Sequence, residues 1–533
     1  MIFNPTEEQK LIINTKAKNT VIQAFAGTGK TTVLVEYSKA NPNERFIYAA
    51  FNRAIKEEAE TRFPRNVVCK TVHAIARSWF VSQGFDGNKI KPFIRRKLYH
   101  DFLSHKKASY DEIKKSEEVL RQFYISSISV IDDAFVKNCN VLNKSKEKSV
   151  AFYNAKVKRL AMLANIIWDN LKSINNNLIG YTHDSYLKLF QVNKVQIEGF
   201  SCILFDESQD SNDVITDIVL SQNMNKIFVG DKHQAIYQFR GSKDALSDFE
   251  ENADEVLHLT ETFRFGDNLA KLASNFLKNY KLEQNVMKGR TDLHTNIKDY
   301  FDEKEAMDIL RDKFPEGITK IYRTNDSLFK DLHTIMNVFK LPFFINGDLS
   351  KYKFDTCLDV YYIMKNRRKD VKEFFLTKYT DLEQLREYAK SSKEEELKDI
   401  IDFVVEQSQN GIDTEEFVNK IKNQSQINKN NYFNFDRRNI IILTTAHVAK
   451  GLEWKNVLMS SDYFKCLDFK YINEKGEKAS KSIFDLKKGY RANTLTEEEK
   501  SFYESEINLI YVTITRAKEN LFVQHEMLNI INN

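Results

Sequence analysis

The feature that most constrains the fold of this chain is the run AFAGTGKTT at Ala24–Thr32. The apolar run Thr20–Phe25 favours a short strand, and Thr31–Lys39 favours a helix. Glycines let the backbone turn closely around a phosphate, and the first turn of a helix offers N–H groups and a favourable dipole. A strand, a glycine-rich turn and a helix in this order predict a phosphate-binding loop in a parallel α/β domain.

Within this run, Gly27 and Gly29 permit the turn. Lys30 can neutralise the β- and γ-phosphates of ATP, and the Thr31 hydroxyl can ligate Mg²⁺. The strict pattern has glycine at the first position, where this chain has Ala24, so a glycine-rich turn without a ligand is the alternative interpretation. The residues predicted to contact the nucleotide in this run are Ala24, Phe25, Ala26, Gly27, Thr28, Gly29, Lys30, Thr31 and Thr32.

A second apolar run ends in two carboxylates, in the sequence ILFDESQD at Ile203–Asp210. Asp206 can hold Mg²⁺ through water, together with Thr31, and Glu207 can polarise an attacking water as a general base. Acidic residues are also favoured in the first turn of any helix, so an acidic helix start without a catalytic role is the alternative. Downstream of a phosphate loop, the pair indicates ATP hydrolysis with Mg²⁺.

A third stretch, IFVGDKHQAIYQFRGS at Ile227–Ser242, is again a predicted strand that runs into a polar turn. Gln234 is long enough to contact the γ-phosphate. The side chains that follow it could stack on bases: Tyr237, Phe239 and Arg240. Aromatic residues at this spacing are more often core residues than nucleic-acid platforms, and this alternative stays open.

The chain has 533 residues, 42% hydrophobic and 29% charged, an ordinary globular balance in a chain too long for one core. Its net charge of +5 is compatible with a nucleic-acid groove but does not argue for one. The five cysteines form no CxxC or Cys/His cluster, so neither a zinc site nor a disulfide framework is indicated. Without a signal-peptide pattern or a membrane-length apolar run, we expect a cytoplasmic protein with no membrane partner, in the host cytoplasm if a phage encodes it.

Short apolar runs followed by polar or helical segments recur in two parts of the chain and predict an α/β fold with two parallel sheets. In the first part these runs are Thr20–Phe25, Phe46–Ala50, Cys202–Phe205 and Lys226–Val229. In the second they are Lys320–Tyr322, Ile440–Thr444, Val457–Ser460 and Leu521–Gln524, with a helix at Ile507–Thr515. Residues 84–189 and 351–436 are predicted as helical insertions, and Lys470–Lys500 as a long loop.

Ten motifs in a fixed order connect these parts. They are NPTEEQ (Asn4–Gln9), AFAGTGKT, AAFNRA (Ala49–Ala54), TVHAIA (Thr71–Ala76), DESQD, VGDKHQAIYQFRG, ETFRFG (Glu261–Gly266), YRTN (Tyr322–Asn325), TTAHVAKGLEW (Thr444–Trp454) and NLIYVTITRAK (Asn508–Lys518). The set resembles that of the UvrD/Rep/PcrA group of superfamily 1 type A DNA helicases. THDSYLKLF at Thr182–Phe190 and the FRFG form most resemble the F-box DNA helicase branch and its short phage and bacterial relatives.

The resemblance implies two RecA-like motor domains with P-loop NTPase topology, each carrying a mainly helical insertion. It implies an ATP-binding domain at 1–83 and 190–262 with an insertion at 84–189. It also implies a second domain at 263–350 and 437–533, with a reduced insertion at 351–436.

The resemblance also assigns roles around ATP. Gln9 matches the residue that reads adenine, Phe263 the aromatic that stacks on it, and Glu453 the position that binds the ribose. Arg264 matches a γ-phosphate arginine and Arg516 an arginine finger from the second domain. The implied catalytic set is Lys30, Asp206, Glu207, Gln234, Arg264 and Arg516.

The nucleic-acid contacts come from the same resemblance. The matching positions are Asn52, Arg53, Thr71, His73, Tyr237, Phe239, Arg240, Arg323, Asn325, Thr445 and His447. Phe239 stands where many relatives have tryptophan, and Phe51 directly precedes Asn52 instead of lying two residues before it. A core histidine satisfied by local contacts is the alternative for His73 and His447.

The leading functional hypothesis is an ATP- and Mg²⁺-dependent DNA helicase that translocates 3′→5′ on single-stranded DNA and unwinds duplex. Its expected partners are single-stranded DNA, single-strand/duplex junctions, and accessory repair, replication or nuclease proteins. The alternative is a motor or switch subunit of a nuclease or phage-defence assembly that does not unwind alone, which the short second insertion favours. RNA as the strand also stays open, because 2′-OH recognition cannot be identified from sequence.

Overall fold

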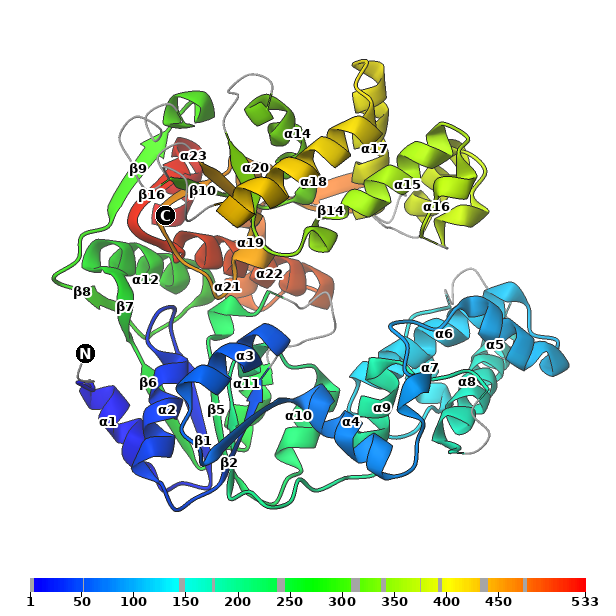
Figure 1. Cartoon of the computed structure of the whole chain (residues 1–533), viewed down its shortest axis with the longest axis horizontal. Helices are drawn as coiled ribbons and strands as arrows, with labels where there is room; N and C mark the ends of the chain where they lie inside the picture. Colours follow the sequence, from blue (N-terminus) through cyan, green and yellow to red (C-terminus); the bar gives the residue numbers. More distant parts are fainter. Residues whose placement is uncertain are drawn as a thin grey trace. The chain divides into compact units, whose positions relative to one another are not determined.

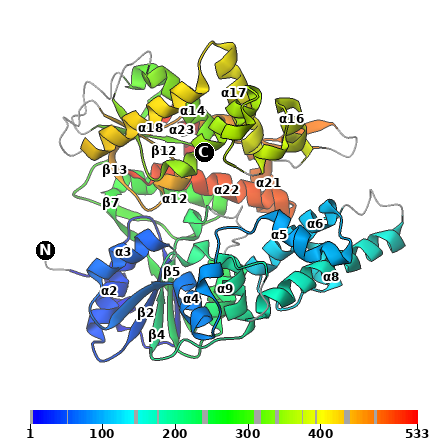
Figure 2. The same ribbon diagram turned by 45° about the vertical axis from the view of Figure 1, so that its right-hand side comes forward.

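The computed structural model describes residues 4–50, 52–142, 149–174, 178–236, 245–307, 317–336, 342–373, 375–391, 395–431, 440–472 and 477–533. The chain divides into two compact units, Met1–Thr260 and Glu261–Asn533 (Figures 1 and 2). Each contains a six-stranded sheet, and the strands of both sheets pair in parallel. The predicted α/β class with two parallel sheets is therefore confirmed.

The sheet of the first unit has the strand order β3-β2-β4-β5-β1-β6. Its strands are β1 (Asn19–Ala24), β2 (Phe46–Ala50), β3 (Val67–Thr71), β4 (Cys202–Phe205), β5 (Asn225–Gly230) and β6 (Glu255–Leu259). The four central strands are the four that the sequence predicts, and their bounds agree to within one residue at each end. The two edge strands, β3 and β6, were not predicted.

Helices cover this sheet and extend away from it (Figure 1). They are α1 (Glu7–Asn14), α2 (Lys30–Ala40), α3 (Arg53–Arg62), α4 (Val72–Ser82), α5 (Arg96–Leu103), α6 (Tyr110–Ile125), α7 (Asp133–Asn138), α8 (Val150–Lys172), α9 (His183–Val192), α10 (Asp213–Leu220) and α11 (Ala245–Glu251). The stretch predicted to be helical therefore carries α5 to α8 and the start of α9. Its bounds as a separate domain stay a prediction.

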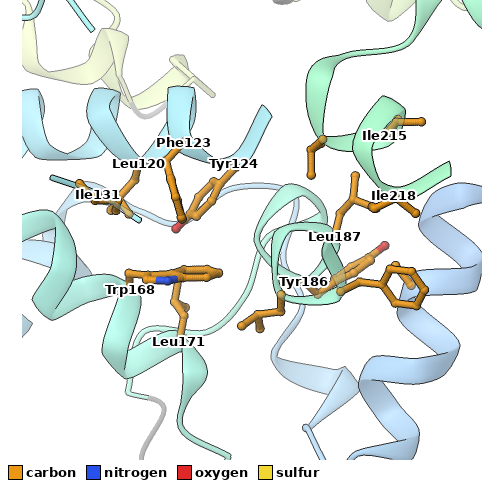
Figure 3. Close-up of a cluster of buried hydrophobic side chains, with 14 of the residues drawn as sticks. Leu120, Phe123, Tyr124, Ile131, Trp168, Leu171, Tyr186, Leu187, Ile215 and Ile218 are labelled. Atoms are coloured by element: carbon orange, nitrogen blue, oxygen red, sulfur yellow. The ribbon is translucent and has the colours of Figure 1, made fainter. Parts of the chain in front are cut away.

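The helices between β3 and β4 share one hydrophobic cluster with the sheet (Figure 3). Phe123 of α6 meets Trp168 of α8 edge to face, with ring centroids 5.2 Å apart. The cluster continues through Tyr186 and Leu187 of α9 to Phe205 of β4. Because the packing is continuous, these helices are held to the sheet by burial of apolar surface rather than tethered as a loose appendage.

Helix α9, which carries the THDSYLKLF stretch, also makes a polar anchor. The Lys188 ammonium is fully buried, donates to the carbonyl oxygens of Ser126 (2.7 Å) and Ile128, and lies 4.3 Å from the ring centroid of Phe123. Gln191 donates to the Ser127 carbonyl at 2.9 Å. Burial lowers the pKa of Lys188 to about 7. The lysine thus satisfies backbone carbonyls of the segment that follows α6.

The second unit has a main sheet with the order β11-β12-β10-β13-β16-β9. Its strands are β9 (Asn296–Tyr300), β10 (Ile318–Tyr322), β11 (Phe343–Ile345), β12 (Ile441–Thr445), β13 (Trp454–Met459) and β16 (Ala517–Gln524). A second, two-stranded parallel sheet contains β7 (Glu261–Gly266) and β8 (Lys288–Arg290). The central four strands of the main sheet are again those predicted, and the edge strands β9 and β11 were not.

Helices also surround the sheet of the second unit. They are α12 (Asp267–Lys281), α14 (Asn325–Thr334), α15 (Phe354–Met364), α16 (Leu382–Ser391), α17 (Glu395–Gln409), α18 (Thr414–Asn431), α19 (Ala446–Ala449), α20 (Asp462–Lys465), α21 (Ile483–Ala492), α22 (Glu497–Ile514) and α23 (His525–Asn532). Helices α15 to α18 occupy the stretch predicted to be helical and share one hydrophobic cluster with the sheet. Within the described parts of both units, no helix combines the length and apolar character needed to cross a membrane.

The prediction of a long loop at Lys470–Lys500 is wrong. The segment contains strand β15 (Lys478–Lys481), which pairs antiparallel with β14 (Phe469–Ile472), then α21 and the start of α22. Ser482 caps α21 by accepting a hydrogen bond from Asp485 N–H, and Ile483 and Leu486 bury the apolar side of that helix. The polar composition hid these elements, because surface helices need only a narrow apolar stripe.

Candidate nucleotide and nucleic-acid site

The glycine-rich loop leaves the carboxyl end of β1 and enters α2 directly. Gly27 and Gly29 have φ values of 75° and 81°, the left-handed region in which glycine is favoured. The Thr28 hydroxyl donates to the Phe25 carbonyl at 2.9 Å and closes the loop on itself. Helix α2 begins at Lys30, and no side chain of the described residues caps its first turn. Such a helix start presents N–H groups and a positive dipole end to an anion.

Three contacts hold the loop from outside. Gln9 is buried in α1, and its Nε2 donates to the Thr28 carbonyl at 3.4 Å. The Phe25 N–H donates to the carbonyl of Leu259, the last residue of β6, at 3.1 Å. The Phe25 ring also stacks on His233, with ring centroids 6.1 Å apart. The predicted adenine-reading residue and the phosphate loop are therefore neighbours.

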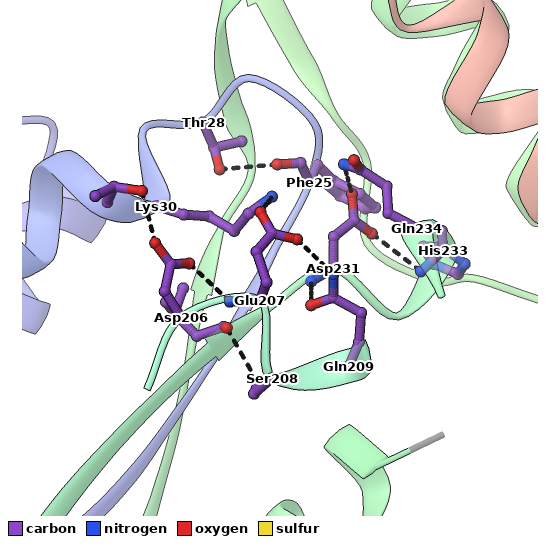
Figure 4. A network of polar contacts seen from close by, with 12 residues as sticks. Phe25, Thr28, Lys30, Asp206, Glu207, Ser208, Gln209, Asp231, His233 and Gln234 are labelled. Atoms are coloured by element: carbon purple, nitrogen blue, oxygen red, sulfur yellow. Dashed lines mark hydrogen bonds and ion pairs between the residues drawn. The ribbon is translucent and has the colours of Figure 1, made fainter. Parts of the chain in front are cut away.

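The carboxylate of Asp206 lies beside the start of α2 and is 1% exposed (Figure 4). Its Oδ2 accepts hydrogen bonds from the Thr31 hydroxyl at 2.6 Å and the Tyr48 hydroxyl at 2.9 Å. Its Oδ1 accepts from the Glu207 N–H at 2.8 Å. Burial raises the pKa of Asp206, and the charge of Glu207 raises it further. The two predicted metal ligands, Thr31 and Asp206, are therefore in direct contact.

Glu207 has a φ of 52°, a left-handed conformation that is rare for glutamate and costs energy. Its Oε2 accepts a hydrogen bond from Gln209 Nε2 at 2.6 Å, and its Oε1 lies 4.0 Å from the Lys30 ammonium. With this left-handed backbone, the Glu207 carboxylate faces Lys30 at the start of α2.

A chain of hydrogen bonds continues from Glu207 to Gln234 (Figure 4). Gln209 Oε1 accepts from the Asp231 N–H at 3.0 Å. The Asp231 carboxylate accepts from Gln234 Nε2 at 2.6 Å and from the His233 N–H at 3.0 Å. The structure thus links the predicted general base to the predicted γ-phosphate contact through two intermediate residues, Gln209 and Asp231.

Sequence reasoning missed three members of this site: Tyr48, Gln209 and Asp231. Tyr48 lies on β2, whose neighbour β4 ends at Phe205, just before Asp206. Gln209 and Asp231 stand inside the motifs DESQD and VGDKHQ, so the carboxamide and the carboxylate at the ends of adjacent strands were the available signal. Only the strand order, with β4 beside both β2 and β5, reveals the contacts.

Gly230, the last residue of β5, leaves room for this network. A Cβ added there would lie 2.5 Å from Gln209 Oε1 and 2.9 Å from Ser208 Oγ. We expect Gly230→Ala to lower the free energy of unfolding by about 1–3 kcal/mol and to reduce ATP turnover, because Gln209 must move. Denaturant unfolding and an ATPase assay measure both effects. Gly87→Ala is the control, since its added Cβ would meet only side chains, the nearest at 3.2 Å. Unchanged stability and turnover in Gly230→Ala would contradict the assignment.

Asp206→Asn is expected to stabilise the nucleotide-free protein while abolishing turnover. The folded-state pKa of Asp206 is raised, so the folded chain binds this proton more tightly than the unfolded chain. As the pH rises from the pKa of Asp206 in the unfolded chain to its pKa in the folded chain, the free energy of unfolding therefore falls. Above the folded-state pKa, the full cost of burying the charged carboxylate is present. Asparagine removes it, and the apparent Tm at neutral pH should rise by about 1–3 °C.

Thermal unfolding with and without Mg²⁺ measures this effect. Added Mg²⁺ should raise the Tm of the wild type and leave that of Asp206→Asn unchanged. A variant that is less stable at neutral pH, or that still gains stability from Mg²⁺, would contradict the role of this carboxylate.

The predicted strand contacts of the first unit lie at the carboxyl ends of β2 and β3. Asn52 and Thr71 are the N-caps of α3 and α4, where their side chains accept from the N–H groups of Ile55 and Ala74 at 3.0 and 3.1 Å. Arg53 is exposed and pairs with Glu57 at 2.7 Å. The caps explain why these polar residues stand here locally, so their role as strand contacts stays a prediction.

His73 is partly exposed, with Nε2 3.7 Å from Asp184 Oδ1 and its ring edge to face with Tyr186. It is therefore not enclosed in the core, which argues against the alternative considered for it. Phe51 and three of the predicted nucleic-acid contacts, Tyr237, Phe239 and Arg240, lie outside the described residues.

In the second unit, the predicted nucleotide residues gather around Arg264. Its Nε donates to Glu453 Oε2 at 2.7 Å, and its NH1 donates to the Thr515 carbonyl at 3.0 Å. Glu453 also pairs with Lys518. These cations hold the pKa of Glu453 below its ordinary value, against the opposing effect of burial. Phe263, next to Arg264, is 39% exposed.

Arg516 follows Thr515 and is fully buried. Its Nε donates to the Val512 carbonyl at 2.8 Å and its NH1 to the Leu452 carbonyl at 3.0 Å. These bonds tie the residue before Glu453 to the end of α22. Whether Arg516 also acts as an arginine finger stays a prediction.

The remaining predicted strand contacts lie at the carboxyl ends of β10 and β12, which pair in register from Ile318 to Tyr322. The Arg323 guanidinium is bonded to both carboxylate oxygens of Glu506, at 2.9 and 2.5 Å. Asn325 begins α14, Thr445 ends β12, and His447 lies in α19. Their contact with nucleic acid stays a prediction.

Comparison with known proteins identifies this architecture. The sequence profile of the UvrD/REP helicase N-terminal domain matches residues 5–254, which include the phosphate loop and the Asp206–Gln234 network. Residues 5–254 are therefore similar to a UvrD/REP helicase N-terminal domain. ATP binding through a P-loop follows from this UvrD/REP assignment, while the roles of single residues are proposals.

Three similar proteins extend the comparison. F-box DNA helicase 1 of Gallus gallus is 27% identical over 547 residues, covering 99% of this chain and 49% of the relative. F-box DNA helicase protein 1 of Schizosaccharomyces pombe is 28% identical over 543 residues, covering 97% and 57%. A probable DNA helicase II homolog of Mycoplasma genitalium is 23% identical over 373 residues, covering 61% and 51%. The chain therefore spans about half the length of the curated relatives that it matches, and the resemblance to UvrD-like helicases is confirmed.

Proposed function

We propose that this protein is an ATP- and Mg²⁺-dependent DNA helicase that moves 3′→5′ on single-stranded DNA and unwinds duplex. The observation that carries the proposal is the hydrogen-bonded series from Thr31 through Asp206 and Glu207 to Gln234, within a UvrD/REP domain. Its similar proteins are named as DNA helicases, which supports DNA as the strand. The direction of movement rests on the resemblance of the motifs.

The residues present fit a bound Mg²⁺ nucleotide. The uncapped start of α2 and the two left-handed glycines leave backbone N–H groups to meet phosphate oxygens. Asp206 is a buried carboxylate beside a threonine hydroxyl, a hard oxygen pair of the kind that Mg²⁺ prefers. A buried carboxylate with a raised pKa gains most from a cation. Bound ATP with Mg²⁺ would supply the phosphoryl group and the metal charge that polarises it.

Each residue of the first unit then has a separate task. Lys30 would neutralise phosphate oxygens, and Thr31 and Asp206 would hold the metal. Glu207 orients the attacking water and accepts its proton. Gln209 donates a hydrogen bond to Glu207 Oε2, the carboxylate oxygen that does not face Lys30. This bond fixes the orientation of the Glu207 carboxylate, as hydrogen-bonded partners of a general base do.

The position of Gln234 suggests how ATP hydrolysis could be connected with the bound DNA strand. It is bound to Asp231, which is joined through Gln209 to Glu207, and it lies three residues before Tyr237 in the chain. A change in the bonds of Gln234 when phosphate is released would therefore act on the segment that bears the predicted stacking residues. We propose that this connection couples ATP turnover to stepping.

The decisive test is directional unwinding, with ATP hydrolysis measured in parallel. Duplexes with a 3′ single-stranded tail should be unwound, those with a 5′ tail should not, and single-stranded DNA should stimulate the ATPase. Unwinding that requires a 5′ tail, or an ATPase that single-stranded DNA does not stimulate, would overturn the proposal. Competition between DNA and RNA strands for stimulation decides between the two nucleic acids.

A second candidate is a motor subunit that unwinds only within a nuclease or defence assembly. It is favoured by the short second set of helices, α15 to α18. Stimulated ATPase without unwinding, restored to unwinding by a co-purified nuclease, would support this candidate over the first.

A further inference from the structure

One peptide bond joins the two units, between Thr260 and Glu261. Thr260 is held by a single carboxylate. Its N–H donates to Glu8 Oε2 at 2.7 Å, and its hydroxyl donates to Glu8 Oε1 at 2.7 Å. Both oxygens of Glu8 thus bind both donors of the residue at which the chain leaves the first unit.

The same short helix contacts the phosphate loop. Gln9, directly after Glu8, donates to the Thr28 carbonyl at 3.4 Å, and Phe25 at the start of the loop donates to the Leu259 carbonyl at 3.1 Å. The loop is therefore connected to Thr260 twice, through α1 and through the last residue of β6. A displacement of the loop at either end acts on the exit of the chain.

Helix α1 is also fixed at its other end. Thr15, its C-cap, donates through its hydroxyl to Glu255 Oε2, at the start of β6, at 2.6 Å. The helix is thus pinned along β6 near both of its ends, and Ile12 packs into the core between them. An element held at two points moves with its neighbours as a rigid body, so it can carry a displacement from Thr28 to Thr260.

We propose that Glu8 is a positioning residue that couples nucleotide occupancy of the phosphate loop to the direction in which the chain enters the second unit. The residues just beyond Thr260 form β7, which carries Phe263 and Arg264. This inference rests on the proposed function, because it assigns a consequence to nucleotide binding. A helix start favours any acidic side chain, but Glu7 shares that effect, and within the part of the chain that the structure describes Glu7 pairs with Lys10 rather than with Thr260.

Because Glu7 and Glu8 lie in the same first turn of α1, Glu7 provides a matched control for Glu8. Glu7→Ala removes a neighbouring carboxylate from the same first turn without touching Thr260, whereas Glu8→Ala removes the clamp. Thr260→Val deletes the hydroxyl that donates to Glu8, and Thr260→Ser keeps it. All variants are made in the full chain, and their thermal unfolding is recorded.

The readouts are the affinity for a fluorescent ATP analogue, the ATPase with and without single-stranded DNA, and hydrogen exchange at the Thr260 amide. In Glu8→Ala, affinity and basal turnover should stay within about twofold, while DNA stimulation falls about tenfold, as for coupled sites. In Thr260→Val, DNA stimulation of the ATPase should fall about threefold. In Thr260→Ser and Glu7→Ala, it should match that of the wild type. The analogue should slow exchange of the Thr260 amide in the wild type and in Glu7→Ala, but not in Glu8→Ala.

Two results would overturn the inference. One is equal behaviour of Glu8→Ala and Glu7→Ala in stimulation and in amide exchange. The other is a wild-type Thr260 amide whose exchange the analogue does not change. If wild-type turnover is not stimulated by DNA, the proposed helicase function fails instead, and the amide-exchange comparison still decides the role of Glu8.

Discussion

Lys30→Ala is expected to abolish ATP turnover, a fall of about 10³-fold or more by comparison with other cations that stabilise phosphoryl transfer. Lys30 is the first residue of α2, its side chain is 11% exposed, and its ammonium lies 4.0 Å from Glu207 Oε1. Its charge opposes the rise in the pKa of Asp206. Without it, phosphates would enter beside two uncompensated negative charges. Phosphate release in the presence of single-stranded DNA measures the loss.

Lys39→Ala is the control for this prediction. Lys39 lies on the same helix, is half exposed, and pairs with Glu36 at 2.8 Å. An exposed pair of this kind contributes at most about 1 kcal/mol to stability, so the control should fold and hydrolyse ATP like the wild type. Normal ATP turnover in Lys30→Ala would contradict the assignment of the glycine-rich loop to the active site.

The limits of sequence reasoning follow the geometry of the two sheets. In each main sheet the four central strands were predicted, because strands covered on both faces form continuous apolar runs, as Phe46–Ala50 and Cys202–Phe205 do. The four edge strands were missed. β3, β6 and β9 mix polar and apolar residues because one side faces solvent, and β11 has only three residues.

The candidate site divides in a similar way. Two local motifs were enough to predict four residues of the site, and the structure brings these four together: Lys30, Thr31, Asp206 and Glu207. Tyr48 could not be predicted, because its contact with Asp206 depends on which strands are neighbours. Likewise, no pattern in the sequence indicates that Arg516 is buried against the Val512 and Leu452 carbonyls.

Glu207→Gln is expected to lower turnover by about 10²- to 10⁴-fold while leaving ATP and single-stranded DNA bound. Glutamine has the same shape, and its oxygen can still accept the hydrogen bond from Gln209 Nε2, but it cannot take a proton from water. Single-turnover hydrolysis and the lifetime of the complex with a DNA strand measure the two effects. Glu198→Gln, an exposed change in the same unit, is the control.

The charge of Glu207 gives this prediction a second readout. It is the largest cause after burial of the raised pKa of Asp206, so Glu207→Gln should return that pKa toward its ordinary value. The remaining carboxylate then ionises more readily, and Mg²⁺ should still raise the Tm of Glu207→Gln. Asp206→Asn should lose both this Mg²⁺ effect and turnover. If instead Glu207→Gln loses the response to Mg²⁺ and Asp206→Asn keeps it, the roles of base and metal ligand are exchanged between the two carboxylates.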